Sequence, residues 1–399
     1  MIDFSQKKAI LIEDMAEARI LQKKMLTDFG FKSIDIAMKA ESAIELLRDN
    51  TYDLILSDYN LGNGKDGQQL LEEVRHSELI PNTSTYLMVT AETSIEMVMG
   101  AIEYQPDGYI TKPFSQALLQ RRLLKLVESK EKLRSVNTAL DSKNFKKAIE
   151  ECEEIIEKYP YLEGKCHRII GECYISLGRY SDAKNVYSTA LKKQKMPWSL
   201  FGLAKTLFLM EKYVSAEKKF QQLMLDNKFF VNAYDWLAKC LIAQNRHDEA
   251  KTVLIDAIER SPKSILRQIE LGKLSLQLKD YFLAEMSFRR AVFLAKHSCF
   301  NSPEIYLNHL RSIAGMASQE EVLPRQKDGF KSTLKKIEEF RLEDIDVATS
   351  THEITIQFYL NQNDSRSATD ALALWESDYQ EGLAHQPSEQ HKVTLDIEG

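Results

Sequence analysis

The sequence predicts an α/β domain built on a doubly wound parallel five-stranded sheet, followed by an all-α solenoid of helical repeats. In residues 8–123, short apolar runs alternate with amphipathic segments of helical period. This alternation is typical of a parallel sheet that is covered by helices on both faces. From residue 130 onward the strand patterns stop, and small residues recur every 33 to 35 positions. Such a period is typical of stacked helical pairs.

The sheet is expected within residues 1–127. Each expected strand is a short buried run, and each expected helix shows a 3.6-residue apolar period. Gly30 follows the first helix, where a helix stop signal belongs. The expected strands are Ala9–Ile12, Ser33–Ala37, Leu54–Ser57, Thr85–Thr90 and Gly108–Thr111. The expected helices are Ala16–Phe29, Ala40–Asp49, Gly67–His76, Ser94–Glu103 and Ser115–Val127.

Polar residues stand at the carboxyl ends of four of these strands, at the edge where such sheets carry their sites. Glu13 and Asp14 follow the first strand, Asp58 follows the third, Thr90 ends the fourth and Lys112 follows the fifth. Three neighbouring carboxylates repel one another unless a cation neutralises them, and Mg²⁺ is the expected cation. With Mg²⁺ bound, one carboxylate can act as nucleophile toward a phosphoryl group.

This set of residues resembles the receiver domain of two-component response regulators. The resemblance covers residues 8–123, and the matching residues are Glu13-Asp14, Asp58, Thr90-Ala91 and Lys112-Pro113-Phe114. It implies that a sensor histidine kinase or a small phosphodonor phosphorylates Asp58. It also implies a Mg²⁺ ion held by Glu13, Asp14, Asp58 and the backbone carbonyl of Asn60.

The resemblance further implies a conformational switch. The implied phosphoryl-binding and switch residues are Thr90, Ala91, Lys112 and Tyr109. Asn60 and Glu92 match the pair found in the fast-dephosphorylating chemotaxis regulator, so we expect a short-lived phosphoryl group. The loop after Asp58 departs from the family, because it lacks the usual proline and is one residue longer than the common form.

Gly62, Gly64 and Gly67 form a second motif, G-x-G-x-x-G, which in other proteins binds dinucleotides. A dinucleotide-binding turn normally follows the first strand, whereas this motif follows the third and stands beside Asp58. A pyrophosphate there would face a cluster of carboxylates. We therefore interpret Gly67 as the start of a helix and the other two as turn residues.

The repeats lie in residues 130–300. Alanines recur 33 to 35 residues apart, at Ala148, Ala183, Ala216, Ala250 and Ala284. Small residues at such spacing let paired antiparallel helices cross closely. The pattern resembles tetratricopeptide repeats, with four full units across 164–297 and half a unit at about 130–160. The resemblance implies a concave face that binds an unidentified protein or peptide.

Five basic residues are candidates for that concave groove. For each of them, an ordinary solvated charge on the surface remains the alternative interpretation. They are Lys165, Arg168, Lys205, Lys239 and Arg267. A role for the array as a scaffold alone also stays open.

Residues 301–399 are expected to form a helical extension. Helices are expected at Glu304–Ala317 and Gly329–Glu343, joined by a polar loop that contains Pro324. A further helical hairpin is expected at 350–360 and 365–378, and it matches the repeat offsets as a degenerate terminal repeat. The matching residues are Tyr359, Ala368, Leu372 and Trp375.

Composition narrows the class of protein. The net charge of −6 lies in residues 1–123, which hold 13 basic and 19 acidic residues, while the remainder holds 40 of each. No basic excess supports nucleic-acid binding. No apolar run is long enough to span a membrane. The five cysteines lack Cys-x-x-Cys spacing and are expected to be reduced, so a cytoplasmic protein is expected.

The leading hypothesis is a response regulator in which phosphorylation of Asp58 gates protein binding by the repeats. We expect no enzymatic activity beyond its own phosphorylation and dephosphorylation. The first alternative is a phosphate sink or kinase-modulating scaffold. The second is a transcriptional regulator that binds DNA, which the balanced charge and the lack of a basic recognition helix disfavour. Dimerisation through the receiver stays open.

Overall fold

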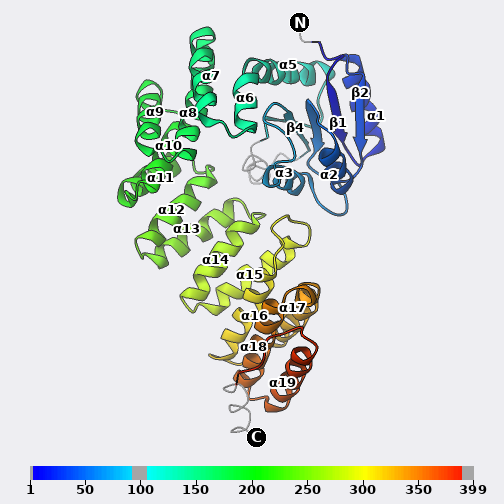
Figure 1. Ribbon diagram of the computed structural model, residues 1–399, viewed down its shortest axis with the longest axis vertical. Helices are drawn as coiled ribbons and strands as arrows, with labels where there is room; N and C mark the ends of the chain where they lie inside the picture. Colours follow the sequence, from blue (N-terminus) through cyan, green and yellow to red (C-terminus); the bar gives the residue numbers. More distant parts are fainter. Residues whose placement is uncertain (1–2, 92–105, 389–399) are drawn as a thin grey trace. The chain divides into compact units, whose positions relative to one another are not determined.

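The computed structural model describes residues 3–91 and 106–388 (Figure 1). The chain packs as two compact units, Met1–Pro262 and Lys263–Gly399, and each is described by itself. The boundary between them falls within the predicted 130–300 array. The expected helix at Ser94–Glu103 lies outside the described residues.

The first unit begins with a five-stranded sheet of strand order β2-β1-β3-β4-β5, in which every neighbouring pair is parallel. The strands are β1 (Lys8–Ile12), β2 (Ser33–Ala37), β3 (Leu54–Asp58), β4 (Thr85–Thr90) and β5 (Gly108–Thr111). The strand order reverses at β1, which pairs with β2 on one side and β3 on the other. This topology confirms the predicted doubly wound sheet.

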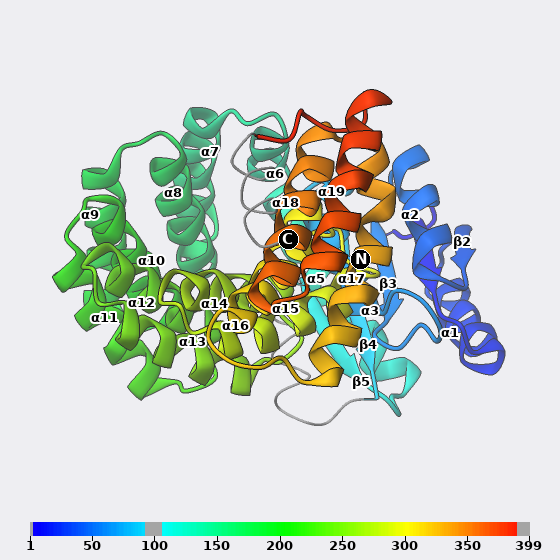
Figure 2. The ribbon, with the colours of Figure 1, turned by 90° about the horizontal axis from the view of Figure 1, so that it is seen from below.

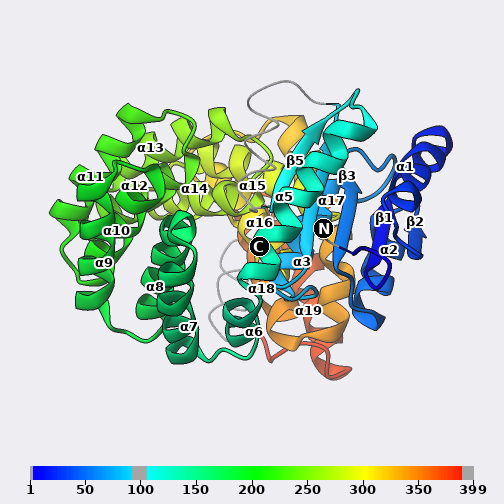
Figure 3. The ribbon, with the colours of Figure 1, turned by 90° about the horizontal axis from the view of Figure 1, so that it is seen from above.

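Helices cover both faces of the sheet, as Figure 3 shows. They are α1 (Ala16–Asp28), α2 (Ala40–Asp49), α3 (Gly67–His76) and α5 (Gln116–Lys132). Successive strand residues point to opposite faces. Ile10 and Ile12 therefore pack with α2 and α3, whereas Ala9 and Leu11 pack with α1 and α5. All four of these strand residues are fully buried.

Helix α5 continues five residues beyond the predicted end at Val127. Leu133 ends α5 and at the same time caps the next helix, α6 (Arg134–Asp141). No linker therefore separates the sheet domain from the helices that follow.

The rest of the first unit consists of antiparallel helical pairs, which Figure 2 shows as successive hairpins. Besides α6 they are α7 (Phe145–Lys158), the 3₁₀ turn η1 (Pro160–Leu162), α8 (Glu163–Ser176), α9 (Tyr180–Lys193), α10 (Pro197–Leu209), α11 (Tyr213–Asp226), α12 (Val231–Ala243) and α13 (His247–Arg260). The periodic alanines of this unit are fully buried at the helix contacts: Ala148, Ala183, Ala216 and Ala250. The predicted repeat architecture is confirmed.

The second unit contains six helices within residues 263–388. They are α14 (Ile265–Gln277), α15 (Tyr281–Ala295), α16 (Pro303–Ala317), α17 (Pro324–Glu343), α18 (Ile345–Asn361) and α19 (Ser365–Gln380). The expected loop position of Pro324 is wrong, because Pro324 is the first residue of α17. Proline suits this position, where its missing N–H is not needed by the helix. Ala368 and Trp375 are buried between α18 and α19.

Candidate functional site

The carboxyl ends of β1, β3, β4 and β5 bring four of the predicted residues together. Glu13 follows β1, Asp58 ends β3, Thr90 ends β4 and Lys112 follows β5. The backbone N–H of Lys112 donates to the carbonyl of Thr90 at 2.7 Å. Glu13, Asp58 and Thr90 are 0%, 5% and 4% exposed. These three side chains are therefore largely buried, and the sheet itself fixes their positions.

The Lys112 ammonium bridges two of the carboxylates. Its Nζ lies 2.8 Å from Asp58 Oδ2 and 2.9 Å from Glu13 Oε2. Asp14 is the third carboxylate, and one oxygen from each of Glu13, Asp14 and Asp58 lies within 4.8 Å of the other two. Residues far apart in the sequence thus form one compact acidic cluster with the Lys112 ammonium against it.

Burial raises the pKa of Asp58, and the charge of Glu13 raises it further, while the hydrogen bond from Lys112 works in the opposite direction. The backbone N–H of Asn60 also donates to the Asp58 carboxylate and favours its charged form. Burial disfavours the Lys112 ammonium, but its hydrogen bonds to Asp58 and Glu13 outweigh that effect and raise its pKa. A second cation near Asp58 would relieve the remaining repulsion.

The cluster fits a hard divalent cation. Its three carboxylates supply the oxygen ligands that Mg²⁺ prefers. Glu13, Asp14 and Asp58 are the only such group of three among residues 3–91 and 106–388. Gly62 keeps the adjoining loop close, because a Cβ there would lie 2.9 Å from Asp14 Oδ2. The donor set and its crowding therefore support the predicted cation site.

Two residues of α1 that sequence reasoning missed support this cluster. Gln22 is 3% exposed and donates from Nε2 to Glu13 Oε2 at 2.7 Å. Arg19 donates from Nη1 to the backbone carbonyls of Glu13 and Asp14, at 3.0 and 2.9 Å. The only signal in the sequence was a glutamine on the face of α1 that also carries Met25.

The other predicted residues lie around the same edge. Asn60 and Ala91 are exposed beside the site. Tyr109 is on β5 and is 41% exposed. Glu92, the second predicted tuning residue, lies outside the described residues.

The three glycines after β3 have backbone roles. Gly62 and Gly64 have positive φ, 69° and 115°, which glycine adopts at no steric cost. A Cβ at Gly67 would lie 2.1 Å from the carbonyl oxygen of Asp58. Asp66 caps α3 by accepting from the backbone N–H of Gln69. These contacts explain the three glycines of the G-x-G-x-x-G motif as parts of a turn that leads into α3.

Two of the predicted groove residues gather around one indole ring. Lys205 on α10 and Lys239 on α12 place their Nζ atoms 5.9 and 4.7 Å from the ring centre of Trp236. Lys205 also forms an ion pair with Glu172 of α8 at 2.8 Å. Phe208 packs edge-on against Trp236, with ring centres 5.3 Å apart. Helices α10 and α12 therefore form a basic and aromatic surface around Trp236, which the carboxylate of Glu172 on α8 borders.

The remaining groove candidates differ from one another. Lys165 is exposed and donates to Ser129 Oγ of α5 at 2.7 Å. Arg168 is exposed on α8. Arg267 is only 4% exposed, so it does not offer an open surface to a partner. The burial of Arg267 was not predictable from its charge, because arginine side chains are more often exposed than buried.

Comparisons with known proteins agree with this geometry. Residues 9–124 match the response regulator receiver domain family, and residues 232–264 match the tetratricopeptide repeat family. The chain is 31% identical over 121 residues to the chemotaxis protein CheY-3 of Vibrio cholerae, covering 30% of this chain and 92% of that protein. It is 30% identical over 121 residues to the chemotaxis protein CheY of Pseudomonas aeruginosa, covering 30% of this chain and 96% of that protein.

Two solved structures also align with portions of this chain. The C-terminal part of a TPR repeat-containing protein from Cytophaga hutchinsonii aligns with a TM-score of 0.47 at 17% identity, covering 60% of this chain and 92% of that one. A CheY-like response regulator receiver domain protein from Methanospirillum hungatei aligns with a TM-score of 0.29 at 23% identity, covering 32% of this chain and 97% of that one.

A parallel five-stranded sheet with acidic residues, a threonine and a lysine at its carboxyl edge defines a receiver-type signalling domain. The chain belongs to the response regulator family, with a CheY-like receiver domain followed by tetratricopeptide repeats. Within residues 3–91 and 106–388, no helix is long and apolar enough to cross a membrane.

Proposed function

We propose that this protein is a phosphorylation-controlled switch in which Asp58 accepts a phosphoryl group from a sensor histidine kinase or a small phosphodonor. One observation carries the proposal: Asp58, buried and next to Glu13, is held by the Lys112 ammonium at 2.8 Å. In this reaction an Asp58 carboxylate oxygen attacks the phosphorus atom, and the bond to the donor's leaving group breaks. Lys112 offsets the charge that accumulates on the phosphoryl oxygens.

Mg²⁺, when bound, would neutralise the acidic cluster and the transferred group. Glu13, Asp14 and Asp58 would hold it, together with the carbonyl of Asn60. The hydroxyl of Thr90 and the Lys112 ammonium would then bind the transferred group. Tyr109 lies on β5, two residues after Asp107. Its side chain would move when Thr90 moves.

The test is labelling of the full chain with acetyl phosphate and Mg²⁺, resolved on phosphate-affinity gels. Wild type is expected to form a shifted, acid-stable and base-labile species, and Asp58→Asn is expected to form none. Asp66→Asn is the matched control, because this loop carboxylate caps α3 and asparagine caps helices equally well. Labelling of Asp58→Asn at the wild-type level would refute the assignment.

For the output, we propose that phosphorylation changes what the repeats bind. In this proposal residues 1–127 act as the receiver, residues 130–300 as the repeat array and residues 301–399 as a helical extension. The support is the direct junction between α5 and α6. Glu131 of α5 accepts from Arg134 of α6 at 3.0 and 2.9 Å and pairs with Lys7 at 2.6 Å. The hydrogen bonds from Arg134 lower the pKa of Glu131 to about 2. This pair therefore stays charged at physiological pH.

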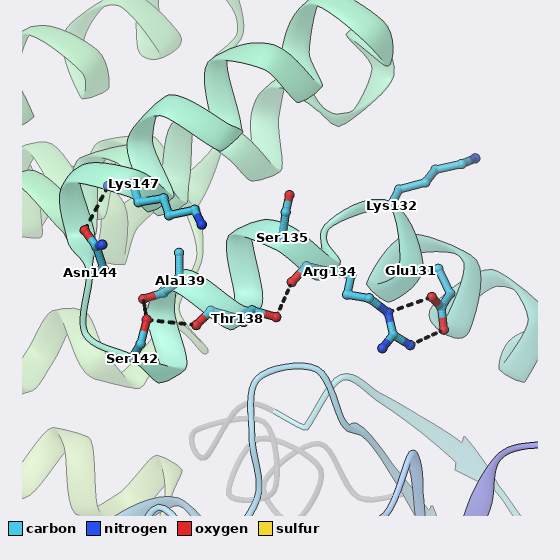
Figure 4. Close-up of a pocket in the computed structure, with 9 residues that line it drawn as sticks. All are labelled: Glu131, Lys132, Arg134, Ser135, Thr138, Ala139, Ser142, Asn144 and Lys147. Carbon is cyan, nitrogen blue, oxygen red and sulfur yellow. Dashed lines mark hydrogen bonds and ion pairs between the residues drawn. The ribbon is translucent and has the colours of Figure 1, made fainter.

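An open pocket of about 590 Å³ lies where α5, α6 and α7 meet (Figure 4). Figure 4 shows Glu131 and Arg134 paired at one end of it, and Asn144 capping α7 at the other. The direct continuation of α5 into α6 through Leu133 would transmit a displacement of α5 to the first repeat.

The receiver also contacts the first repeat through a polar latch, defined here as Asp107, Lys130, Asn82 and Asp141. Lys130 pairs with Asp107 at 2.8 Å and donates to the carbonyl of Asn82 at 2.7 Å. Asn82 in turn donates to Asp141 Oδ1 from its backbone N–H at 2.8 Å and from Nδ2 at 2.7 Å. The latch thus connects the start of β5 to the end of α6.

The output surface in this proposal is the basic and aromatic surface around Trp236. Protein capture by the full chain, with and without beryllofluoride and Mg²⁺, tests it. The expected result is a protein captured in one state only, whose capture is lost with Trp236→Ala and no longer depends on beryllofluoride with Asp58→Asn. Identical capture in both states would refute gating and favour a constitutive scaffold.

One observation favours a phosphate sink as the second candidate. Asn60 and Ala91 are exposed beside the buried Asp58, so water can approach the site. Replacing Asn60 with leucine is expected to lengthen the phosphoryl lifetime about tenfold, which corresponds to roughly 1.4 kcal/mol in the barrier. A wild-type lifetime of hours would contradict the sink.

A further inference from the structure

Gln22 is a polar side chain on the buried face of α1. It is 3% exposed and shares that face with Met25 and Leu26, which are 6% and 0% exposed. A buried amide costs free energy unless it is hydrogen-bonded, whereas an apolar side chain at the same place carries no such cost. The partner of this amide is Glu13, whose Oε2 accepts from Gln22 Nε2 at 2.7 Å.

The two oxygens of Glu13 are used unequally. Oε2 accepts from Gln22 and also from Lys112 Nζ at 2.9 Å. Among the residues that the structure describes, Oε1 has only the backbone N–H of Met15, at 3.4 Å, which is long for a hydrogen bond. Because both strong donors take the same oxygen, the carboxylate is held in one rotation and Oε1 keeps its lone pairs for a cation.

A glutamate needs this help more than an aspartate does. Its side chain has one more rotatable bond, so holding its carboxylate in one place costs more conformational entropy. Hydrogen bonds to metal-binding carboxylates orient them and raise metal affinity. Arg19 fixes only the backbone carbonyls of Glu13 and Asp14. Control of the Glu13 carboxylate is therefore left to Gln22 and Lys112.

We propose that Gln22 is a positioning residue that holds Glu13 ready to bind the divalent cation. The proposal rests on the proposed function, since it assigns Glu13 to the cation site. Gln22 touches neither the phosphoryl group nor the cation and acts only through Glu13.

The experiment measures Mg²⁺ affinity of the full chain by isothermal titration calorimetry. Gln22→Leu is expected to weaken Mg²⁺ binding by about tenfold or more. Its labelling rate at saturating Mg²⁺ is expected to stay close to that of wild type, since the nucleophile and Lys112 are intact. Met25→Leu, on the same buried face, is the control and is expected to bind Mg²⁺ as wild type does. Gln22→Met serves as a second apolar variant if the leucine variant does not fold.

A double-mutant cycle separates positioning from a general structural effect. In a Glu13→Asp background the shorter carboxylate is out of reach of Gln22, so Gln22→Leu is expected to change the Mg²⁺ dissociation constant by less than about threefold. Thermal unfolding checks that each variant is folded. An equal loss in both backgrounds, or unchanged Mg²⁺ affinity in a folded Gln22→Leu protein, would overturn the proposal.

The controls also separate this inference from the proposed function. If wild type binds Mg²⁺ and labels at Asp58 while Gln22→Leu does the same with equal affinity, the positioning role fails and the proposed function stands. If wild type neither binds Mg²⁺ nor labels, the proposed function fails and the positioning role fails with it.

Discussion

A Cβ atom on Gly171 would lie 2.3 Å from Cζ of Tyr187. The Tyr187 ring is fully buried between α8 and α10, and a Cβ on Gly202 would meet the same ring, also at 2.3 Å. The ring is therefore clamped between two glycines and cannot move aside. Gly171→Ala is expected to destabilise the protein by about 1–3 kcal/mol, the usual cost of overpacking. Urea unfolding followed by circular dichroism measures it.

Gly164→Ala is the matched control on the same helix. The nearest atom to a Cβ there is Trp198 Cζ2 at 3.9 Å, an ordinary contact. Alanine is the better helix former, so this variant is expected to be neutral or slightly stabilised. Equal unfolding midpoints for the two variants would contradict the clamp.

Lys112 is expected to be needed for phosphorylation and not for cation binding. Lys112→Met removes the ammonium that contacts Asp58 and Glu13, and the labelling rate is expected to fall about 100-fold. Mg²⁺ affinity is expected to stay close to that of wild type, because the loss of a competing cation offsets the loss of one of the two donors that hold the Glu13 carboxylate. Lys8→Met, which breaks a pair with Asp35 at the other end of the strands, is expected to label normally. Labelling of Lys112→Met at the wild-type rate would rule out this role.

The polar latch is expected to hold α6 against the receiver. Asp141→Ala removes the acceptor of both Asn82 hydrogen bonds. Because such bonds contribute about 1 kcal/mol net, amide exchange in α6 is expected to rise roughly fivefold. Hydrogen-exchange mass spectrometry measures this, and Ser142→Ala, which loses only bonds within α6, is the control. Unchanged exchange in the Asp141→Ala protein would show that the latch carries no local stability.

The second unit is expected to lose stability as the pH falls below 6.5. Burial lowers the pKa of His352, and the charge of Arg341 adds to this, against the hydrogen bond to Asp378 at 2.7 Å. The unfolded chain therefore takes up this proton at a higher pH than the folded chain. Protons bound preferentially by the unfolded state reduce stability as the pH falls through that window.

Urea unfolding at pH 7.5 and at lower pH values, followed by the fluorescence of Trp375 in a Trp198→Phe and Trp236→Phe background, measures this effect. The indole ring stacks on His352 with ring centres 5.7 Å apart, so it reports the local state. His352→Gln is expected to flatten the pH dependence. A wild-type unfolding midpoint that does not fall with pH would contradict the assignment.

The strand and helix pattern of the receiver was predictable because both have strong periodicities. Five elements, among them Ser33–Ala37 and Gly108–Thr111, have the predicted bounds. The end of α5 was not predictable from apolar period, because its last turn is held by charged contacts of Lys130 and Glu131. The place of Pro324 was also not predictable from the apolar period, because local backbone geometry decides where α17 begins.

The candidate site followed from strand ends, because parallel strands bring their carboxyl ends to one edge whatever their sequence separation. Its support by Gln22 and Arg19 did not follow, since the rotation of α1 about its own axis decides which polar residue meets Glu13. The burial of Arg267 likewise depends on its tertiary surroundings and not on its charge.

The shared residue Leu133, which ends α5 and caps α6, also limits how this receiver can be exchanged with others. A fragment cut at residue 127 would lose Lys130 and Glu131, and with them one ion-pair partner each of Asp107 and Lys7. A transplanted receiver would have to keep the register of α5 through Lys132, because inserting a single residue there rotates everything downstream by about 100° at 3.6 residues per turn. Grafting this receiver onto another protein therefore requires that the helical register of α5 is kept across the junction.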